Sequence, residues 1–103
     1  MNNLDAMSER IRKTLSEKDT AREKMLPLCR DSIRYSSTAI RAVHRREFSE
    51  AEKLIKSARS VLSEAEKAIT QCSEMGNTGA VKDAQKEMAE ASITLALVNG
   101  KDL

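Results

Sequence analysis

Helix-breaking residues are scarce in this chain of 103 residues, which contains three glycines and one proline. No glycine lies between Leu4 and Arg46, and Pro27 alone interrupts that stretch. Proline removes a backbone donor inside a helix but is accepted in a helix's first turn. The stretch is therefore predicted to be one long helix kinked at Pro27, or two helices of which the second opens at Pro27.

Apolar side chains in the second part of this stretch recur every three or four residues, which is the spacing of one helix face. The positions on this face are Met25, Cys29, Ile33, Ser36, Ile40 and Val43. A second helix is predicted to start at the sequence Ser49-Glu50-Ala51-Glu52, which has the pattern of a capping box, with Phe48 as a hydrophobic staple. Its apolar stripe is unbroken and consists of Ala51, Leu54, Ile55, Ala58, Val61, Leu62, Ala65, Ile69 and Cys72.

A third helix is predicted from about Ala80 to Val98. The sequence Gly76-Asn77-Thr78-Gly79 forms the turn before it, and Gly100 ends it. Short connections make neighbouring helices antiparallel. We therefore expect one all-α domain over residues 1–103, with a long antiparallel helical hairpin that folds back near Glu47–Ser49. The third helix packs against this hairpin in an up-down helical array.

Several classes of protein are excluded by composition. No apolar run approaches the roughly 20 residues of a membrane-spanning helix, and the first residues lack the pattern of an export signal. Two cysteines, Cys29 and Cys72, are too few for a disulfide scaffold and lack metal-site spacing. Both lie on apolar faces and are predicted to be buried free thiols. A cytoplasmic protein with no membrane contact is expected.

The third predicted helix is apolar on two sides near its end. Val81, Ala84, Met88, Ala91 and Leu95 form one stripe, and Ile93 and Leu97 lie nearly opposite it. A helix that is apolar all round is normally buried. We therefore expect either that another chain, a second copy or a partner, covers Ile93 and Leu97, or that this sequence is part of a longer protein.

A basic row is the first feature that could bind a ligand. Residues 25–46 contain five arginines against one acid, Asp31, which gives this segment a net charge of +4. Four of them fall within about 60° on a helical wheel, beside the apolar face, and none has an acid four residues away. A guanidinium offers a fixed fork of donors to a phosphate, whereas a solvated face usually interleaves opposite charges. The candidate nucleic-acid-binding residues are Arg30, Arg34, Arg41 and Arg45.

An acidic stripe on the third predicted helix is the second such feature. Asp83, Glu87 and Glu90 lie within about 60° of one another, and the two glutamates occupy adjoining turns. They fall between the apolar stripe and Ile93/Leu97, so these carboxylates are expected to be partly buried if both apolar sides of the helix are buried. Buried carboxylates need a cation, a metal ion or a proton, although an exposed acidic edge is also common on helices.

Two stretches together resemble the translin family. The segment LCRDSIRYSSTAIRAVHRREFSEAEKLIKSA, residues 28–58, is similar to a helix of that family and to the acidic-capped helix that follows it. The segment DAQKEMAEA, residues 83–91, resembles the metal-binding helix of translin-associated factor X and its archaeal relatives, with Met88 in place of an aromatic residue.

The resemblance implies an all-α protein that assembles into oligomers and binds RNA or single-stranded DNA. In the factor X branch, two glutamates and an aspartate from a later helix bind magnesium and cut RNA. By position the two glutamates are Glu87 and Glu90, which become the candidate catalytic and Mg²⁺-binding residues. The chain resembles only the N-terminal half of the family, so a second half or a partner would supply the third acid. Little or no cleavage is expected from this chain alone.

Two classes of function follow. One is a translin-like nucleic-acid-binding protein with an incomplete Mg²⁺-dependent endoribonuclease site. The other is a non-catalytic helical interaction or oligomerisation module whose charged faces are only solvated.

Overall fold

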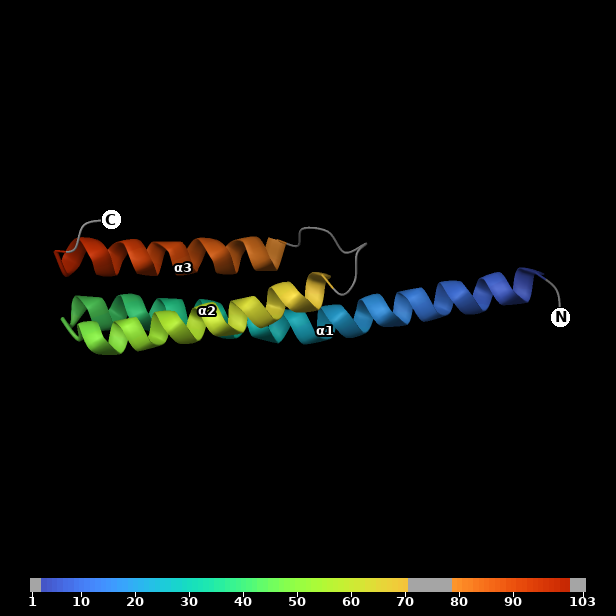
Figure 1. Ribbon diagram of the computed structural model, residues 1–103, viewed down its shortest axis with the longest axis horizontal. Helices are drawn as coiled ribbons and strands as arrows, with labels where there is room; N and C mark the ends of the chain where they lie inside the picture. The colour runs from blue at the N-terminus through green and yellow to red at the C-terminus, as the bar shows by residue number, and fades with distance from the viewer. Residues whose placement is uncertain (1–2, 71–78, 101–103) are drawn as a thin grey trace.

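The chain forms three α-helices in an up-down arrangement, as the sequence predicts (Figure 1). We describe a computed structural model that defines residues 3–70 and 79–100. Helix α1 spans Asn3–His44, α2 spans Phe48–Thr70, and α3 spans Gly79–Val98. The predicted turn 76–79 lies mostly outside the described residues, as does Cys72. The molecule is a rod with extents of 68 × 19 × 15 Å.

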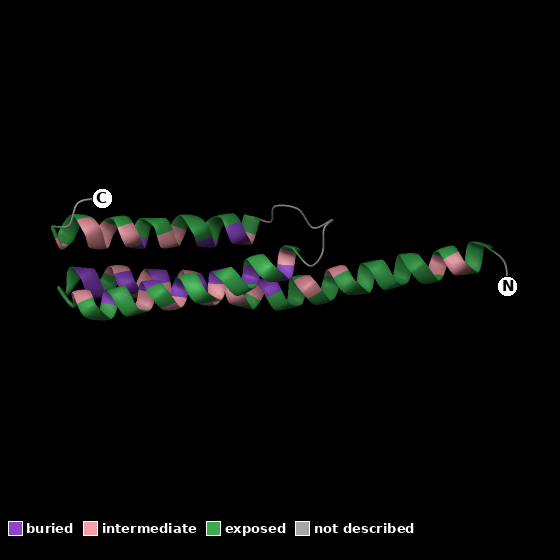
Figure 2. Ribbon diagram, viewed as in Figure 1, coloured by how far each residue is buried: buried purple, intermediate pink, exposed green. Residues whose placement is uncertain are grey.

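Helix α1 is one continuous helix of 42 residues that contains Pro27 in its interior. Of the two alternatives predicted from the sequence, the single long helix is therefore the one observed. The carbonyl group that loses its backbone donor belongs to Glu23, which is exposed, so water can hydrate it. Met25 is the first residue of α1 that is buried. The preceding part of the helix extends beyond α2 and α3 and is largely exposed (Figure 2).

The hairpin between α1 and α2 closes through two backbone hydrogen bonds. The Glu47 amide donates to the Ala42 carbonyl and the Arg46 amide donates to the Val43 carbonyl, each at 2.9 Å. Arg46 has a φ of 61°, so these bonds form a Schellman motif with an arginine at the position that usually holds glycine. The fold-back predicted near Glu47–Ser49 is confirmed.

The predicted capping box is wrong in register. Helix α2 starts at Phe48, and its first backbone bond runs from the Ala51 amide to the Glu47 carbonyl at 3.0 Å. Ser49 is therefore already inside the helix and cannot cap it. The Schellman motif fixes the chain direction one residue before Phe48, so the backbone enters α2 earlier than the side-chain pattern indicates.

Small side chains line the contact between α1 and α2. Alanine recurs every seven residues on the buried face of α2, at Ala51, Ala58 and Ala65. On α1, Ser32 and Ser36 are completely buried. The Ser32 hydroxyl donates to the Ala58 carbonyl at 2.9 Å, which shows that the side chain of one helix reaches the backbone of the other. The Ser36 hydroxyl oxygen is buried without a hydrogen-bond partner.

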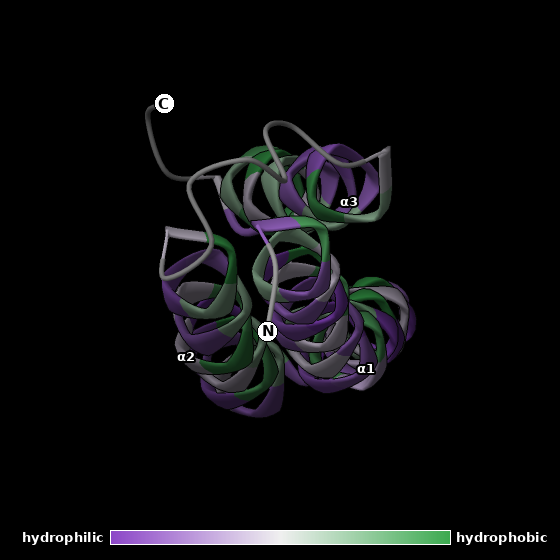
Figure 3. Ribbon diagram, turned by 90° about the vertical axis from the view of Figure 1, so that its right-hand side faces the viewer, coloured by the Kyte–Doolittle hydropathy of each residue, from purple (hydrophilic) through white to green (hydrophobic). Residues whose placement is uncertain are grey.

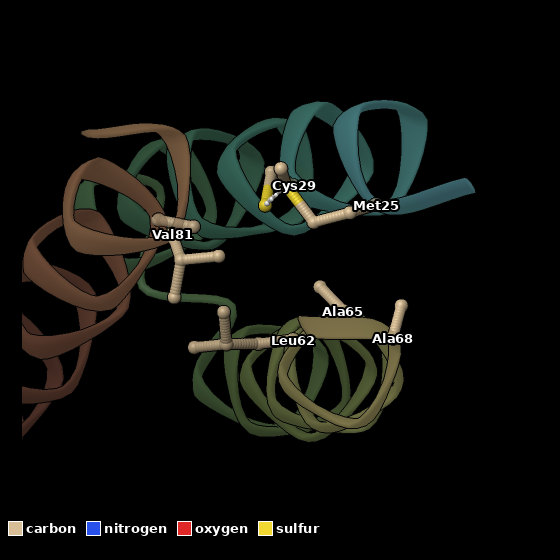
Figure 4. Packing of buried hydrophobic residues seen from close by; sticks show 7 residues of the cluster. Met25, Cys29, Leu62, Ala65, Ala68 and Val81 are labelled. Atoms are coloured by element: carbon tan, nitrogen blue, oxygen red, sulfur yellow. Dashed lines mark hydrogen bonds between the residues drawn. The ribbon is translucent and has the colours of Figure 1, made fainter. Parts of the chain in front are cut away.

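Helix α3 completes the core by packing against both other helices. Its Val81 and Ala84 join a cluster with Met25, Cys29 and Leu62, which lies where all three helices meet (Figure 4). Ala91 continues the contact along the bundle. Seen end on, the three helices surround this shared apolar interior (Figure 3). Beyond Val98, the Asn99 amide donates to the Leu95 carbonyl, and Gly100 has a φ of 75°. The predicted stop at Gly100 is thereby confirmed.

Replacement of Ala58 by leucine is expected to destabilise the fold by about 1–3 kcal/mol, because the larger side chain would push α1 away and break the Ser32 hydrogen bond. Ala89→Leu, at an exposed position of α3, is the matched control and should change the free energy of unfolding by less than about 0.5 kcal/mol. Urea unfolding monitored by circular dichroism measures both. Equal stability of the two variants would contradict the tight contact between α1 and α2.

Cys29 is a buried free thiol, as predicted, and its Sγ lies 3.4 Å from the Met25 Sδ. Burial, and secondarily the negative charge of Glu66, raises the pKa of this thiol above its usual 9.0. The folded state therefore favours the neutral thiol over the thiolate. The contribution of the neutral Cys29 thiol to the free energy of unfolding is complete below pH 9 and is lost as the pH rises through the pKa of the folded state.

Above pH 9, the free energy of unfolding should therefore fall more steeply for the wild type than for Cys29→Ala. Other titrating groups are common to both proteins and cancel in the difference between them. Urea unfolding at pH 8 and at pH 10 gives this difference. A stability gap between the two proteins that stays constant over this range would contradict the raised pKa.

Candidate nucleic-acid interface

All four candidate arginines are exposed and lie on one face of α1. Arg34 stands two residues from Ser32 and from Ser36, and Arg41 stands two residues from Ala39 and from Val43. All four of these neighbours are buried. Two residues correspond to about 200° around a helix, so the arginines point away from the core. Their position beside the apolar face was predicted wrongly, because they lie opposite it.

The reason for this difference is the size of the residues that make the core. The sequence-based face includes Ile33 and Ile40, which are only half-buried. The structure buries Ser32, Ala39 and Ala42 instead. The buried face is thus rotated around α1 towards the small residues, which moves it away from the arginine row.

Two of the four arginines have carboxylate partners. The Arg34 guanidinium lies 3.1 Å from an Asp31 oxygen, and the Arg45 guanidinium lies 3.2 Å from a Glu47 oxygen. Arg30 and Arg41 have no ion-pair partner within residues 3–70 and 79–100. Ion pairs this exposed contribute little to stability, so a phosphate can replace either carboxylate at small cost.

Other contacts of the row are weak. Arg41 donates to the Thr38 hydroxyl at 3.3 Å, and the Arg34 guanidinium carbon lies 5.8 Å from the centre of the Tyr35 ring. The guanidinium groups are therefore held loosely and remain available to an anion. From Arg30 to Arg45 the row extends about 22 Å along the helix.

The structure adds a basic end to this row that was not predicted from the sequence. The hairpin turn borders an open hollow of about 640 Å³, lined by Arg45, Arg46, Glu47, Phe48, Ser49, Glu50 and Lys53. Arg46 and Lys53 carry positive charge beyond the end of α1, and with Glu47 and Glu50 in the same lining the net charge of the hollow is +1. The adjacent residues Arg45 and Arg46 between two predicted helices were a signal in the sequence for this basic end. The direction of their side chains depends, however, on the left-handed conformation of Arg46.

The two candidate glutamates lie on adjoining turns of α3, as predicted, but their burial differs. Glu87 is half-buried and Glu90 is exposed. Partial burial was predicted for the case in which Ile93 and Leu97 are covered, and in the chain by itself these two residues are 47% and 65% exposed. No ion pair in the described part of the chain joins these glutamates to the arginine row.

The donor set on α3 fits a magnesium site only in part. Mg²⁺ is usually held by one or two carboxylates together with water and substrate phosphate, which Glu87 and Glu90 could provide. Among the described residues, no three or more histidine, cysteine, aspartate or glutamate side chains gather where they could hold a metal ion. The described residues therefore supply no third protein ligand beside Glu87 and Glu90.

Comparisons with family models, with curated proteins and with solved structures found no match to this chain. The translin-family relationship therefore stays a prediction from the two motifs. None of the described helices is long and apolar enough to cross a membrane.

Titration calorimetry tests the glutamate pair directly. Mg²⁺ or Mn²⁺ should bind the wild type weakly, and the heat should disappear in Glu87→Gln/Glu90→Gln. The matched control is Glu64→Gln/Glu66→Gln, which makes the same charge change at exposed positions that point to different sides of α2. Equal heats from the wild type and the α3 variant would contradict the metal assignment.

Proposed function

We propose that this protein binds the phosphate backbone of RNA or single-stranded DNA along the outer face of α1. The observation that carries the proposal is the row of four exposed arginines, of which Arg30 and Arg41 lack a carboxylate partner among the described residues. The arginines lie opposite the packed core, so a strand can approach them without any rearrangement of α2 or α3. The basic end at Arg46 and Lys53 extends the same surface.

The chemistry of this face favours phosphate over base recognition. Guanidinium groups bind phosphate oxygens bidentately, whereas base stacking requires aromatic side chains. Tyr35 is the one aromatic residue within α1, and it is half-buried. Binding should therefore depend little on base sequence and strongly on salt.

Glu87 and Glu90 have a secondary place in this proposal. In an assembled form they would contribute carboxylate ligands to a magnesium ion, which would neutralise charge on a bound phosphate. The described residues provide two carboxylates for this role, and we expect little or no cleavage by the chain alone.

A non-catalytic interaction module is the second candidate function. It is favoured by the exposed apolar side chains at the end of α3, where Ile93, Leu97 and Val98 are 47%, 65% and 39% exposed. Such a module would use its charged faces only for solvation, so it predicts no binding of a single-stranded oligonucleotide.

Charge reversal of the two unpaired arginines distinguishes these functions. Arg30→Glu/Arg41→Glu should weaken binding of a fluorescent oligo(U) or oligo(dT) by more than about tenfold in anisotropy titrations. The slope of log K against log salt should fall in magnitude by about 1.4, which corresponds to two lost phosphate contacts on a single strand.

The matched control is Lys56→Glu/Arg59→Glu, which makes the same charge change on exposed positions of α2. It should retain most of the affinity. If the α1 variant binds as tightly as the wild type, or if both variants lose affinity equally, the arginine row is not the binding surface.

A further inference from the structure

The N-terminal part of α1 carries an apolar stripe that contacts nothing in the described structure. Its four members are 51–67% exposed and recur every three or four residues: Leu4, Met7, Ile11 and Leu15. Exposed apolar side chains are common singly, but a regular stripe on a projecting helix marks a surface for another helix.

This stripe continues the face of α1 that packs in the bundle. Leu4 and Ile11 stand three and two heptads before Met25, and Leu15 stands two heptads before Cys29. A heptad shifts direction by only about 20° on a straight helix. The stripe and the core therefore face the same side, and α2 and α3 cover that side only from Met25 onwards.

We propose that a second copy of this chain covers the stripe as an antiparallel helix, which forms a twofold dimer with the two bundles at opposite ends. The stripe residues are separated by three, four and four positions along the chain, and by four, four and three in the reverse direction. The two orders therefore agree to within one residue. An antiparallel copy therefore places Leu4 opposite Leu15 of the second copy, and Met7 opposite Ile11. All four side chains then meet apolar partners in a self-complementary contact.

The single long helix decides the orientation. In a parallel pair, the α1 of the second copy would continue along the stripe's side into the volume that α2 and α3 occupy beyond Met25 (Figure 1). In the antiparallel pair, the second copy's α1 runs out past the first copy's N-terminus instead. Asn3 of the second copy then lies level with about residue 16 of the first copy. Roughly 13 Å of the first copy's α1 separates this point from Met25, where the bundle begins.

The contact also accounts for the helical state of a segment that lacks tertiary packing. Residues 3–24 have no buried side chain, and in proteins most of the stability of a helix comes from tertiary packing of its apolar face. Dimerisation should therefore raise helicity as well as mass. The interface is small, which limits the affinity of the dimer. Arg10 lies beside the stripe near the twofold axis, so the Arg10 side chains of the two copies would face each other and repel. We therefore expect a dissociation constant in the micromolar range.

Sedimentation velocity from low micromolar to several hundred micromolar protein tests this proposal. The wild type should pass from monomer to dimer, and its helical signal at 222 nm should rise over the same range. Met7→Ser/Ile11→Ser should weaken the dimer by more than about tenfold, because each central side chain is removed twice. The bundle should remain folded, since both residues are exposed.

The control is Ile93→Ser/Leu97→Ser, which removes two apolar side chains from the exposed end of α3. This variant should dimerise like the wild type. A wild type that stays monomeric at the highest concentration overturns the proposal. Loss of the dimer in the α3 variant but not in the α1 variant overturns it as well, and places the contact on α3.

Disulfide trapping tests the orientation. In a Cys72→Ser background, Leu4→Cys and Leu15→Cys proteins of different tagged mass are oxidised separately and as a mixture. The antiparallel dimer predicts that, in the mixture, a disulfide joins one Leu4→Cys protein to one Leu15→Cys protein. It predicts few disulfides between two copies of the same variant. Efficient disulfide formation between two copies of the same variant, when each variant is oxidised separately, would overturn the antiparallel arrangement.

Discussion

The close contact between α1 and α2 determines most of what this molecule presents to its surroundings. The Ser32 hydroxyl reaches the Ala58 carbonyl directly, and alanines at heptad intervals keep the two helices near each other. Such a contact is possible only where side chains are small, so Ile33 and Ile40 lie at the edge of the core and are half-buried. The outward direction of the arginines follows from this packing, because the small residues set the buried face of α1 opposite them.

The helices themselves could be predicted from the sequence because breakers and apolar periodicity act locally. Three helices, the fold-back before α2 and the stop at Gly100 all follow from such signals. The continuation of α1 through Pro27 could not be read in this way. It depends on whether the carbonyl that loses its donor is exposed to water, which is a property of the packed molecule.

The position of the candidate site was harder to predict, because hydropathy does not mark small buried residues. Ser32 counts as polar in a sequence pattern and Ala39 and Ala42 as only weakly apolar, yet all three are completely buried. Their burial rotates the core face of α1 and places the arginines opposite it. Glu90 illustrates the same limit, since its exposure depends on which side of α3 meets the hairpin.

Arg46 links the conformation of the hairpin to its charge. Its φ of 61° is a conformation that glycine adopts readily and that costs a residue with a Cβ about 1–2 kcal/mol. A glycine there would therefore make the hairpin more stable and, at the same step, remove a cation from the basic end of the molecule. Selection for thermal stability and selection for positive charge would therefore act in opposite directions at this one position.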